Sequence, residues 1–283
     1  MKPDFNALNA HFQLALKEDV GEGDHSALAS IPASAKGRVR LLVKEDGILA
    51  GLALAEHLFA LFDNSIDFHA KLSDGQRVKK GDIAFEVQGP SRSLLTIERL
   101  VLNYMQRLSG IASQSRVYAD RVEGTGAKVL DTRKTTPGLR VLEKWAVRLG
   151  GCYNHRMGLY DMVMLKDNHI DFCGSISAAV EQTRAYLHDR QISIPIEVEV
   201  RNEVELHQVL DCKGVQRVML DNFSVDETRR AVALINGQLE TESSGGITLE
   251  TIRDYAECGV NFISVGALTH QIKSMDLSLK ALS

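Results

Sequence analysis

The second half of the chain alternates short apolar runs with amphipathic segments of helix length. From about residue 127 the strand-like runs are AKVLD, DMVMLK, IPIEVEV, VQRVMLD, QLETESS and VNFISVG, and helix-length segments separate them. Parallel strands need a crossover of a dozen or more residues between them, so repeated βα units predict a parallel sheet. Six such units in succession predict a βα barrel, which we place at residues 111–269.

The first part of the chain mixes helices and strands without a repeat. Residues 5–19 have apolar positions at helical spacing, and residues 52–62 form a short apolar helix. Residues 37–51 and 72–90 alternate like strands, with Asp74-Gly75 and Lys80-Gly81-Asp82 as turns. Residues 91–123 predict a long helix that Gly110 breaks. This order predicts an α+β sandwich domain at residues 1–110, on which the tail at 270–283 packs back.

Each predicted barrel strand ends in a polar group. The groups are Asp131, Lys166, Glu199, Asp221, Ser243 with Ser244, and Ser264 with Gly266. One polar residue at a strand end is usually a helix cap. Six in register are better explained by a site, because the carboxyl ends of barrel strands share one mouth where active sites are built.

The chemistry at this mouth is that of an anion site. Arg and Lys occur in the stretches DTRKTTPGLR (131–140), NHR (154–156) and MLKDNHI (164–170), and converging cations select a polyanion. Glu199 and Asp221 could hold magnesium, or pair with these cations and orient them. The glycine loops SSGGIT (243–248) and SVGAL (264–268) each join a strand to a helix, where bare backbone N–H groups can cradle a phosphate.

Composition removes several other classes of function. The formal net charge of -4 does not favour a nucleic-acid partner. The N-terminus has no signal-peptide core, and no run approaches the ~20 apolar residues of a membrane span. The four cysteines have no CxxC spacing, so we expect reduced thiols in a cytoplasmic, soluble protein that needs no zinc site or redox pair.

Long motifs in the chain resemble those of the quinolinate phosphoribosyltransferases. They are ERLVLNYMQRLSGIAS (98–113), DTRKTTPGLR (131–140), GGCYNHRMGLYDMVMLKDNHI (150–170), IEVEV (196–200), VMLDNFS (218–224), SSGGIT and ISVGALTH. The resemblance runs nearly end to end. It implies an N-terminal open sandwich, an incomplete βα barrel and a homodimer whose sites share residues across the interface.

The resemblance also implies an activity. Enzymes of this family are pentosyltransferases that join quinolinate to phosphoribosyl pyrophosphate. They release nicotinate mononucleotide, carbon dioxide and pyrophosphate in de novo NAD synthesis, with magnesium and no covalent cofactor.

The family motifs assign roles by position. The residues implied for quinolinate are Arg133, His155, Arg156, Lys166 and, from the partner subunit, Arg99. Those implied for phosphoribosyl pyrophosphate are Thr132, Lys134, Asn168, Ser244, Gly245, Gly246, Ser264, Val265, Gly266 and Ala267. The implied catalytic groups are Lys134, Lys166, Glu199 and Asp221, and the last two are the implied magnesium ligands. Which glutamate of IEVEV faces the site is open between Glu197 and Glu199.

Two other functions stay open at this stage. One is a paralogue of the same fold, similar to the ModD-like proteins, with another substrate. The other is a barrel lyase in which Lys166 forms a Schiff base, a chemistry that favours a lone desolvated lysine over one ringed by arginines.

Overall fold

The computed structural model describes residues 2–282 and divides them into two compact units. The sandwich unit comprises Met1–Arg116, Thr135–Gly151 and Leu268–Ser283, and the barrel unit comprises Val117–Lys134 and Cys152–Ala267. This grouping differs from the predicted boundaries, because residues 111–116, 135–151 and 268–269 group with the sandwich unit. As a statement about domains that fold independently, the predicted boundary near residue 110 stays a prediction.

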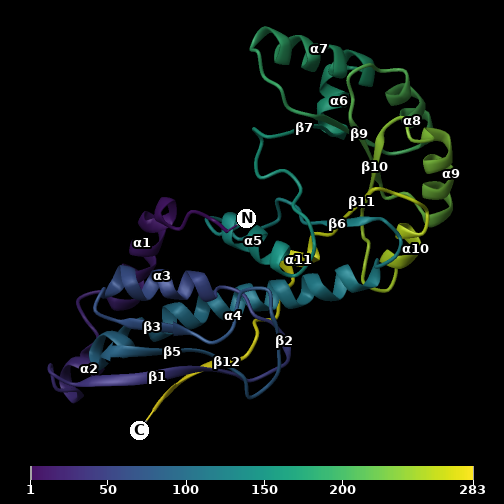
Figure 1. Cartoon of the computed structure of the whole chain (residues 1–283). Helices are drawn as coiled ribbons and strands as arrows, with labels where there is room; N and C mark the ends of the chain where they lie inside the picture. Colours follow the sequence, from purple (N-terminus) through teal and green to yellow (C-terminus); the bar gives the residue numbers. More distant parts are fainter. Residues whose placement is uncertain (1, 283) are drawn as a thin grey trace. The chain divides into compact units, whose positions relative to one another are not determined.

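The sandwich unit is built on an antiparallel sheet in the order β12-β1-β5-β3 (Figure 1). Its strands are β1 (Lys36–Val43), β3 (Asp67–Ala70), β5 (Ile83–Pro90) and β12 (Leu277–Ala281), and β2 (Gly47–Ile48) pairs with β4 (Arg77–Val78). Its helices are the 3-10 turn η1 (Asn6–Leu8), α1 (Asn9–Val20), α2 (His25–Ser30), α3 (Leu52–Phe62) and α5 (Arg140–Leu149). The pairing of β12 with β1 brings the C-terminal segment onto this sheet.

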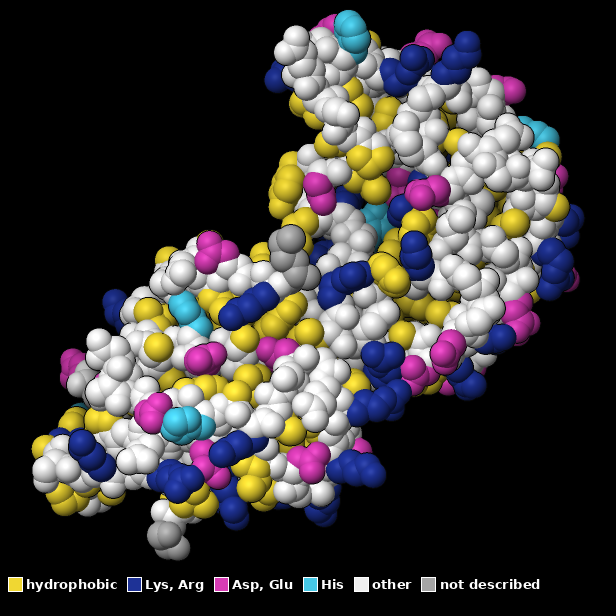
Figure 2. Space-filling model, viewed as in Figure 1, with side chains coloured by type: hydrophobic (Ala, Val, Ile, Leu, Met, Phe, Trp, Pro, Cys, Tyr) yellow, Lys and Arg dark blue, Asp and Glu magenta, His cyan; other side chains and the backbone are white. Residues whose placement is uncertain are grey.

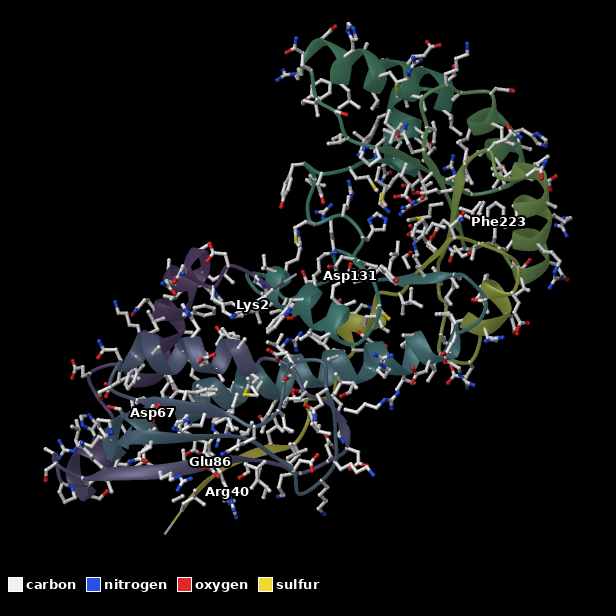
Figure 3. The ribbon with its side chains drawn as sticks, viewed as in Figure 1. Lys2, Arg40, Asp67, Glu86, Asp131 and Phe223 are labelled. Atoms are coloured by element: carbon white, nitrogen blue, oxygen red, sulfur yellow. The ribbon has the colours of Figure 1, made fainter. Side chains whose placement is uncertain are left out.

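Strand alternation gives this sheet one apolar and one polar face. Phe85 on β5 is buried and packs against Phe59 of α3, with ring centroids 6.0 Å apart. Glu86, the next residue, lies on the other face in register with Arg40 of β1 (Figure 3). The helix α3 packs on the apolar face, as expected for an α+β sandwich, and this part of the predicted fold class is confirmed.

The long helix α4 (Ser91–Arg121) is continuous, so the prediction that Gly110 breaks it was wrong. Gly110 instead permits a close approach. A Cβ there would overlap the backbone carbonyl oxygen of Lys273 and lie 3.1 Å from the side chain of Ile272. A single glycine costs a long helix only ~1 kcal/mol, which packing can offset. Among the described residues, no helix combines the length and apolar character needed to cross a bilayer.

The barrel unit has one parallel sheet of six strands, in the order β6-β11-β10-β9-β8-β7. The strands are β6 (Lys128–Leu130), β7 (Val163–Leu165), β8 (Ile196–Val200), β9 (Arg217–Asp221), β10 (Glu240–Ser244) and β11 (Phe262–Ser264). The helices that follow them are α6 (Asp167–Cys173), α7 (Ile176–Asp189), α8 (Glu203–Leu210), α9 (Val225–Ile235), α10 (Ile252–Ala256) and α11 (Ala267–His270).

This strand order is that of a barrel left open at one seam. Neighbours in the sheet are also neighbours in the chain from β7 to β11, and β11 then pairs with β6. The missing pairing is between β6 and β7, where only a parallel bridge from Leu130 to Tyr153 continues the sheet. The predicted incomplete βα barrel is therefore confirmed.

The two faces of the barrel sheet have opposite chemistry. Leu165, Val198, Val218 and Leu220 form an apolar core with residues of α7, α8 and α9, which lie along the outer side of the strands (Figure 1). Phe223, labelled in Figure 3, belongs to the same layer. Because side chains alternate along a strand, the neighbouring positions face inward. These inward positions are Glu197, Glu199, Arg217, Met219, Asp221, Glu240, Glu242 and Ser244.

Candidate active site

The inner face of the barrel sheet carries charged side chains in successive layers along the barrel axis. In most barrels these layers consist of apolar side chains. In register, Glu197, Arg217 and Glu240 form one row, and Glu199, Met219 and Glu242 form the next row toward the carboxyl ends. Figure 2 shows charged side chains of both signs, with a histidine, gathered in a hollow of the barrel unit. The same pairing shows that Glu197 and Glu199 share a face and differ in depth.

Lys166 and Glu199 form an ion pair at the mouth. Lys166 immediately follows β7 and caps α6, and its Nζ donates to Glu199 Oε2 at 2.7 Å. The lysine side chain is 43% exposed and the carboxylate 10%. Schiff-base chemistry favours a lone desolvated lysine, whereas Lys166 is partly exposed and paired with a carboxylate. The arrangement therefore suits anion binding better than the lyase alternative.

Asp221, the last residue of β9, lies at the rim of the barrel mouth and accepts hydrogen bonds from two neutral donors. Its Oδ1 accepts from Ser244 Oγ and its Oδ2 from Asn222 Nδ2, both at 2.7 Å. Two predicted site residues, Asp221 and Ser244, are thus brought into direct contact from adjacent strands. Neutral hydrogen bonds orient this carboxylate and leave its charge available to a ligand.

Gly245 is required by the geometry of this rim. It has a φ of 91°, and the backbone N–H of Asn222 donates to the carbonyl of Ser244 beside it. A Cβ at position 245 would overlap the Asn222 side chain and come within 2.7 Å of the Asn222 nitrogen. Both the left-handed backbone and the close approach exclude a larger residue.

We expect Gly245→Ala to displace Asn222 and Asp221 and to lower the affinity for phosphoribosyl pyrophosphate at least tenfold, since ~1 Å of misplacement at a site is worth about a hundredfold. The matched control is Gly237→Ala, which has a similar positive φ of 74° and nothing within 4 Å of its Cβ. Calorimetric titration of both variants measures the difference. Equal affinities in the two variants would show that the Gly245 loop does not serve the phosphoribosyl ligand.

Both glycine loops join a strand to a helix, as predicted. After Ser244 to Gly246, residues 247–251 include a turn and α10 begins at Ile252. The role of this loop in binding a phosphate stays a prediction. After the other loop, α11 does begin at Ala267, directly behind Gly266, but it has only four residues.

Asp131 organises the segment that carries His155 and Arg156. It is fully buried at the end of β6, and its Oδ1 accepts the backbone N–H of His155 at 2.9 Å. Its Oδ2 accepts from Asn154 Nδ2 at 2.6 Å. A buried carboxylate must be fully hydrogen-bonded, so Asp131 fixes this turn against the first strand.

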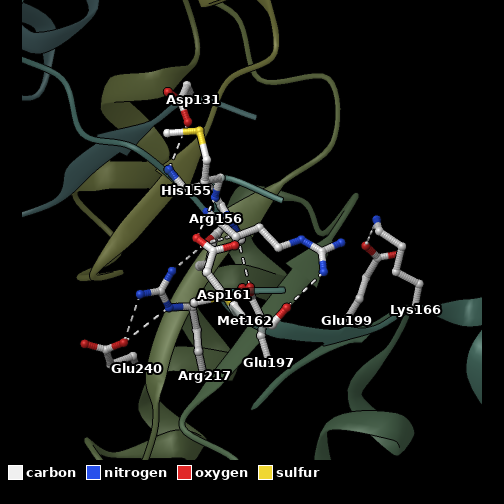
Figure 4. A network of polar contacts seen from close by, with 12 residues as sticks. Asp131, His155, Arg156, Asp161, Met162, Lys166, Glu197, Glu199, Arg217 and Glu240 are labelled. Atoms are coloured by element: carbon white, nitrogen blue, oxygen red, sulfur yellow. Dashed lines mark hydrogen bonds and ion pairs between the residues drawn. The ribbon is translucent and has the colours of Figure 1, made fainter. Parts of the chain in front are cut away.

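His155 turns its ring into the charged interior of the barrel (Figure 4). Its Nε2 lies 3.1 Å from Glu197 Oε2 and 3.5 Å from Glu242 Oε2. Its Nδ1 accepts the backbone N–H of Arg156 at 2.6 Å. The predicted role of His155 as a direct quinolinate ligand stays a prediction, and in this conformation both ring nitrogens face groups of the protein.

Two features bear on the charge of His155 in opposite directions. Burial alone would lower its pKa, but hydrogen bonds and charge from Glu197 and Glu242 raise the pKa to about 9. The N–H of Arg156, in contrast, needs a bare lone pair on Nδ1. In either charge state Nε2 lies within 3.5 Å of both carboxylates, so the direction of the ring does not depend on the outcome.

Arg217 supplies the cation that balances the buried glutamates. Its Nη1 lies 3.1 Å from Glu242 and its Nη2 lies 3.0 Å from Glu240. The guanidinium also stacks over the ring of Phe262, 3.8 Å from its centroid. Burial raises the pKa of Glu197, whereas the pKa of Glu242 is lowered, against its burial, by His155 and Arg217.

His155, Glu197 and Glu242 also meet the distance criterion for a metal site, with ligand atoms within 4.8 Å of one another. Their chemistry argues against magnesium there. All three are buried, and Glu242 already binds the Arg217 guanidinium. Magnesium usually retains several waters and prefers an all-oxygen shell, whereas this buried cluster is closed to water and includes a histidine nitrogen.

Arg156 and Arg133 place two cations near one another. Burial and then the charge of Arg133 lower the pKa of Arg156, while the charges of Glu197 and Asp161 act in the opposite direction. Arg156 Nη1 also donates to the carbonyl of Met162 at 3.1 Å, which directs the guanidinium. Two neighbouring cations suit a ligand with more than one anionic group.

The remaining predicted residues are placed as follows. Lys134 is exposed after β6, where its backbone N–H bonds Thr132 Oγ1 at 3.1 Å. Asn168 is exposed in the first turn of α6. Arg99 is exposed on α4, within the sandwich unit.

Comparison with known proteins identifies the relatives of this chain. The family model described as the N-terminal domain of quinolinate phosphoribosyl transferase matches residues 24–109, and that of the C-terminal domain matches residues 111–280. The chain is 46% identical to quinolinate phosphoribosyltransferase [decarboxylating] 1b of Nicotiana tabacum, over 96% of this chain and 82% of the relative. It is 43% identical to a probable nicotinate-nucleotide pyrophosphorylase [carboxylating] of Bacillus subtilis, over 95% and 90%.

Solved structures agree with the sequence relatives. NadC from Streptococcus pyogenes superimposes with a TM-score of 0.94 at 40% identity, covering all of both chains. The nicotinate-nucleotide pyrophosphorylase from Francisella tularensis superimposes with a TM-score of 0.93 at 37% identity, over 99% of this chain and 98% of that one. With both halves of the chain matched and the barrel mouth lined as described, the protein belongs to the quinolinate phosphoribosyltransferase family.

Proposed function

We propose that this protein transfers the phosphoribosyl group of phosphoribosyl pyrophosphate to the ring nitrogen of quinolinate and removes the adjacent carboxylate. The products are nicotinate mononucleotide, carbon dioxide and pyrophosphate, and the reaction serves de novo NAD synthesis. The observation that carries the proposal is the paired cations Arg133 and Arg156 beside the Lys166–Glu199 ion pair. Quinolinate has two adjacent carboxylates, and only a pocket with several cations can hold both in a low-dielectric site.

The two substrates meet different groups at the mouth. Arg133, Arg156 and Lys166 bind the quinolinate carboxylates, while Lys134 and the loops at 244–246 and 264–267 bind the phosphoribosyl substrate. Attack of the ring nitrogen at C1 of the ribose expels pyrophosphate through an oxocarbenium-like state. Glu199 or Asp221, both on the inner face of the sheet, can stabilise that positive charge.

Decarboxylation follows from the charge that transfer creates. Once the ring nitrogen is alkylated and cationic, loss of the neighbouring carboxylate leaves a carbanion that the nitrogen stabilises directly. The bond to carbon dioxide breaks with its electron pair left on the ring, and a proton then restores the aromatic C–H. A pocket of Arg and Lys favours the dianionic ground state, so the alkylation step is needed to start this loss.

Magnesium is the metal that the rim fits. The carboxylate of Asp221 is held by the neutral donors Ser244 and Asn222, so its oxygens keep their charge for a hard cation. Glu199 and Asp221 are the residues that would hold the ion, through substrate or water. When bound, it would neutralise charge on the leaving pyrophosphate.

We place the protein in the cytoplasm as a homodimer. Its four cysteines are free thiols, as suits a reducing compartment. The exposed position of Arg99 on α4 leaves its side chain available to a second subunit. Relatives with chloroplastic or mitochondrial names show that location varies among related chains.

Release of labelled carbon dioxide from quinolinate tests the function. We expect release only when phosphoribosyl pyrophosphate is present, because only the alkylated nitrogen can accept the electron pair. Removal of magnesium with a chelator is expected to stop the reaction, and added magnesium to restore it. Release without the phosphoribosyl donor would contradict the order of steps, and no release under any condition would favour the paralogue with another substrate.

A further inference from the structure

The interior of the barrel holds charged groups that have no role in the reaction proposed above. Glu197 and Glu242 are fully buried, and the Arg217 side chain is 11% exposed. Isolated buried charges cost several kcal/mol each, so a set of them persists only with mutual pairing. An apolar layer would stabilise a barrel core equally well, which indicates that these charges serve something beyond folding.

The contacts form a continuous chain from the floor of the barrel to its mouth. Arg217 of β9 binds Glu242 of β10 at 3.1 Å. Glu242 and Glu197 then receive His155 Nε2, and the opposite ring nitrogen receives the backbone N–H of Arg156. His155, Glu197 and Glu242 are buried, and the two arginines at the ends of the chain are partly buried.

We infer that Glu242 and Arg217 are positioning residues for the acid pocket: through the His155 ring they fix the turn that carries Arg156. The inference rests on the proposed function for its kinetic part. Arg217 begins β9, and the Glu242 carboxylate lies against His155 and Arg217, so we assign neither residue to a substrate. Glu197 is the nearer carboxylate to His155, but Glu242 is the one anchored by Arg217, so the orientation of the ring is transmitted through Glu242.

The pairing also explains why the ring is held at two points. Nε2 faces the two carboxylates of Glu197 and Glu242, and Nδ1 accepts the backbone N–H of Arg156. The ring cannot flip without placing Nδ1 against the carboxylates and losing the Arg156 N–H contact. The backbone of Arg156 is thus fixed by His155, while Asp131 fixes the preceding N–H.

Glu240 provides a matched control within the same strand. Glu240 and Glu242 both bind Arg217, but only Glu242 contacts His155. The Glu240 side chain is 52% exposed, so its neutralisation leaves no buried charge without a partner. Glu242→Gln and Glu240→Gln therefore remove the same charge from the same arginine and differ in the link to His155.

The experiment compares these two variants in the full-length protein. We expect Glu242→Gln to lower kcat/KM for quinolinate by about tenfold to a hundredfold, as for a misplaced binding group, with KM for phosphoribosyl pyrophosphate changed less than about twofold. Glu240→Gln is expected to keep wild-type values. In protein labelled with ¹⁵N-histidine, the ring signals of His155, assigned with His155→Gln, should move in Glu242→Gln and stay in place in Glu240→Gln.

Other outcomes overturn the inference. Unchanged quinolinate kinetics and unchanged His155 signals in a folded Glu242→Gln variant would do so, as would equal effects in the Glu240→Gln control. If Glu242→Gln does not fold, Arg217→Lys and Glu242→Asp decide instead. Both keep the charge and alter the geometry, and wild-type behaviour in both would overturn it.

Two measurements distinguish this inference from a metal site at the same cluster and from the proposed function. The first is the metal content of the purified protein. If the protein holds stoichiometric metal, and a chelator that removes it also shifts the His155 ring signals, the cluster is a metal site and the positioning role is overturned. Calorimetric binding of quinolinate to the wild-type protein tests the proposed function alone. If the wild type neither binds nor converts quinolinate, the proposed function fails, while the His155 signals still report whether Glu242 holds the ring.

Discussion

Replacing Arg156 by alanine is expected to reduce kcat/KM for quinolinate about thirtyfold or more, because a desolvated carboxylate then loses its charged partner. This factor corresponds to ~2 kcal/mol of lost transition-state stabilisation. Arg156 is half-buried at the barrel mouth, directed by the Met162 carbonyl and set beside Arg133. Steady-state kinetics with quinolinate varied at saturating phosphoribosyl pyrophosphate measure the effect. Because quinolinate is bound by these cations in the ground state as well, we expect KM for quinolinate to rise more than kcat falls.

A second arginine of the same unit serves as the control. Arg229 lies on α9, where it is 60% exposed and pairs with Asp226 one turn earlier. Arg229→Ala removes the same side chain from a solvated surface pair, which is worth ~0–1 kcal/mol, and should leave turnover unchanged. Normal turnover by Arg156→Ala, with Arg229→Ala as a folded reference, would mean that the acid pocket lies elsewhere.

The barrel could be predicted from the sequence because its signal is periodic over many residues. Apolar runs such as VMLD at 218–221 recur at βα spacing, and each run became a strand. Chemistry at the strand ends could be predicted for the same reason, since parallel strands bring their carboxyl ends to one edge. Asp221 and Ser244, more than twenty residues apart, are in hydrogen-bond contact at that edge as expected.

The sequence predicts that Glu197 and Glu199 face the same way, but it does not choose between them. In a strand of period two, positions 197 and 199 must share a face, so both glutamates of IEVEV point inward. What periodicity does not give is depth along the barrel axis. The register of β8 against β9 sets that depth, and it places Glu199 beside Lys166 and Glu197 beside His155.

The buried cluster at Glu242 and Arg217 was not predicted, because the sequence around Glu242 gives little indication that this residue is buried. In QLETESS, Glu242 occupies an alternate position of a strand with few apolar residues, which reads as an exposed edge. The curvature of the sheet buries Glu242 against His155, a residue distant from it in the sequence. The direction of the His155 ring was likewise outside sequence reasoning, because a histidine beside an arginine predicts a cation without predicting which way it faces.

The predicted sharing of the site between subunits leads to the largest expected effect. Arg99 is exposed on α4 and Lys134 is exposed after β6, so neither replacement by alanine removes buried packing. We expect Arg99→Ala and Lys134→Ala each to abolish turnover, since each removes a cation from an anionic ligand in the same composite site. Circular dichroism and the oligomeric state of both variants should match the wild type.

Mixing the two inactive variants distinguishes a shared site from a site within one chain. If Arg99 acts in the partner's site, a mixed dimer contains one site with both lesions and one site with neither. Random mixing of equal amounts makes about half of the dimers mixed, so activity should return to roughly a quarter of the wild-type level. Subunit exchange is checked independently by differential tagging of the two variants. A mixture as inactive as its parents, with exchange demonstrated, would show that Arg99 serves its own chain, because in that case every site keeps one of the two lesions.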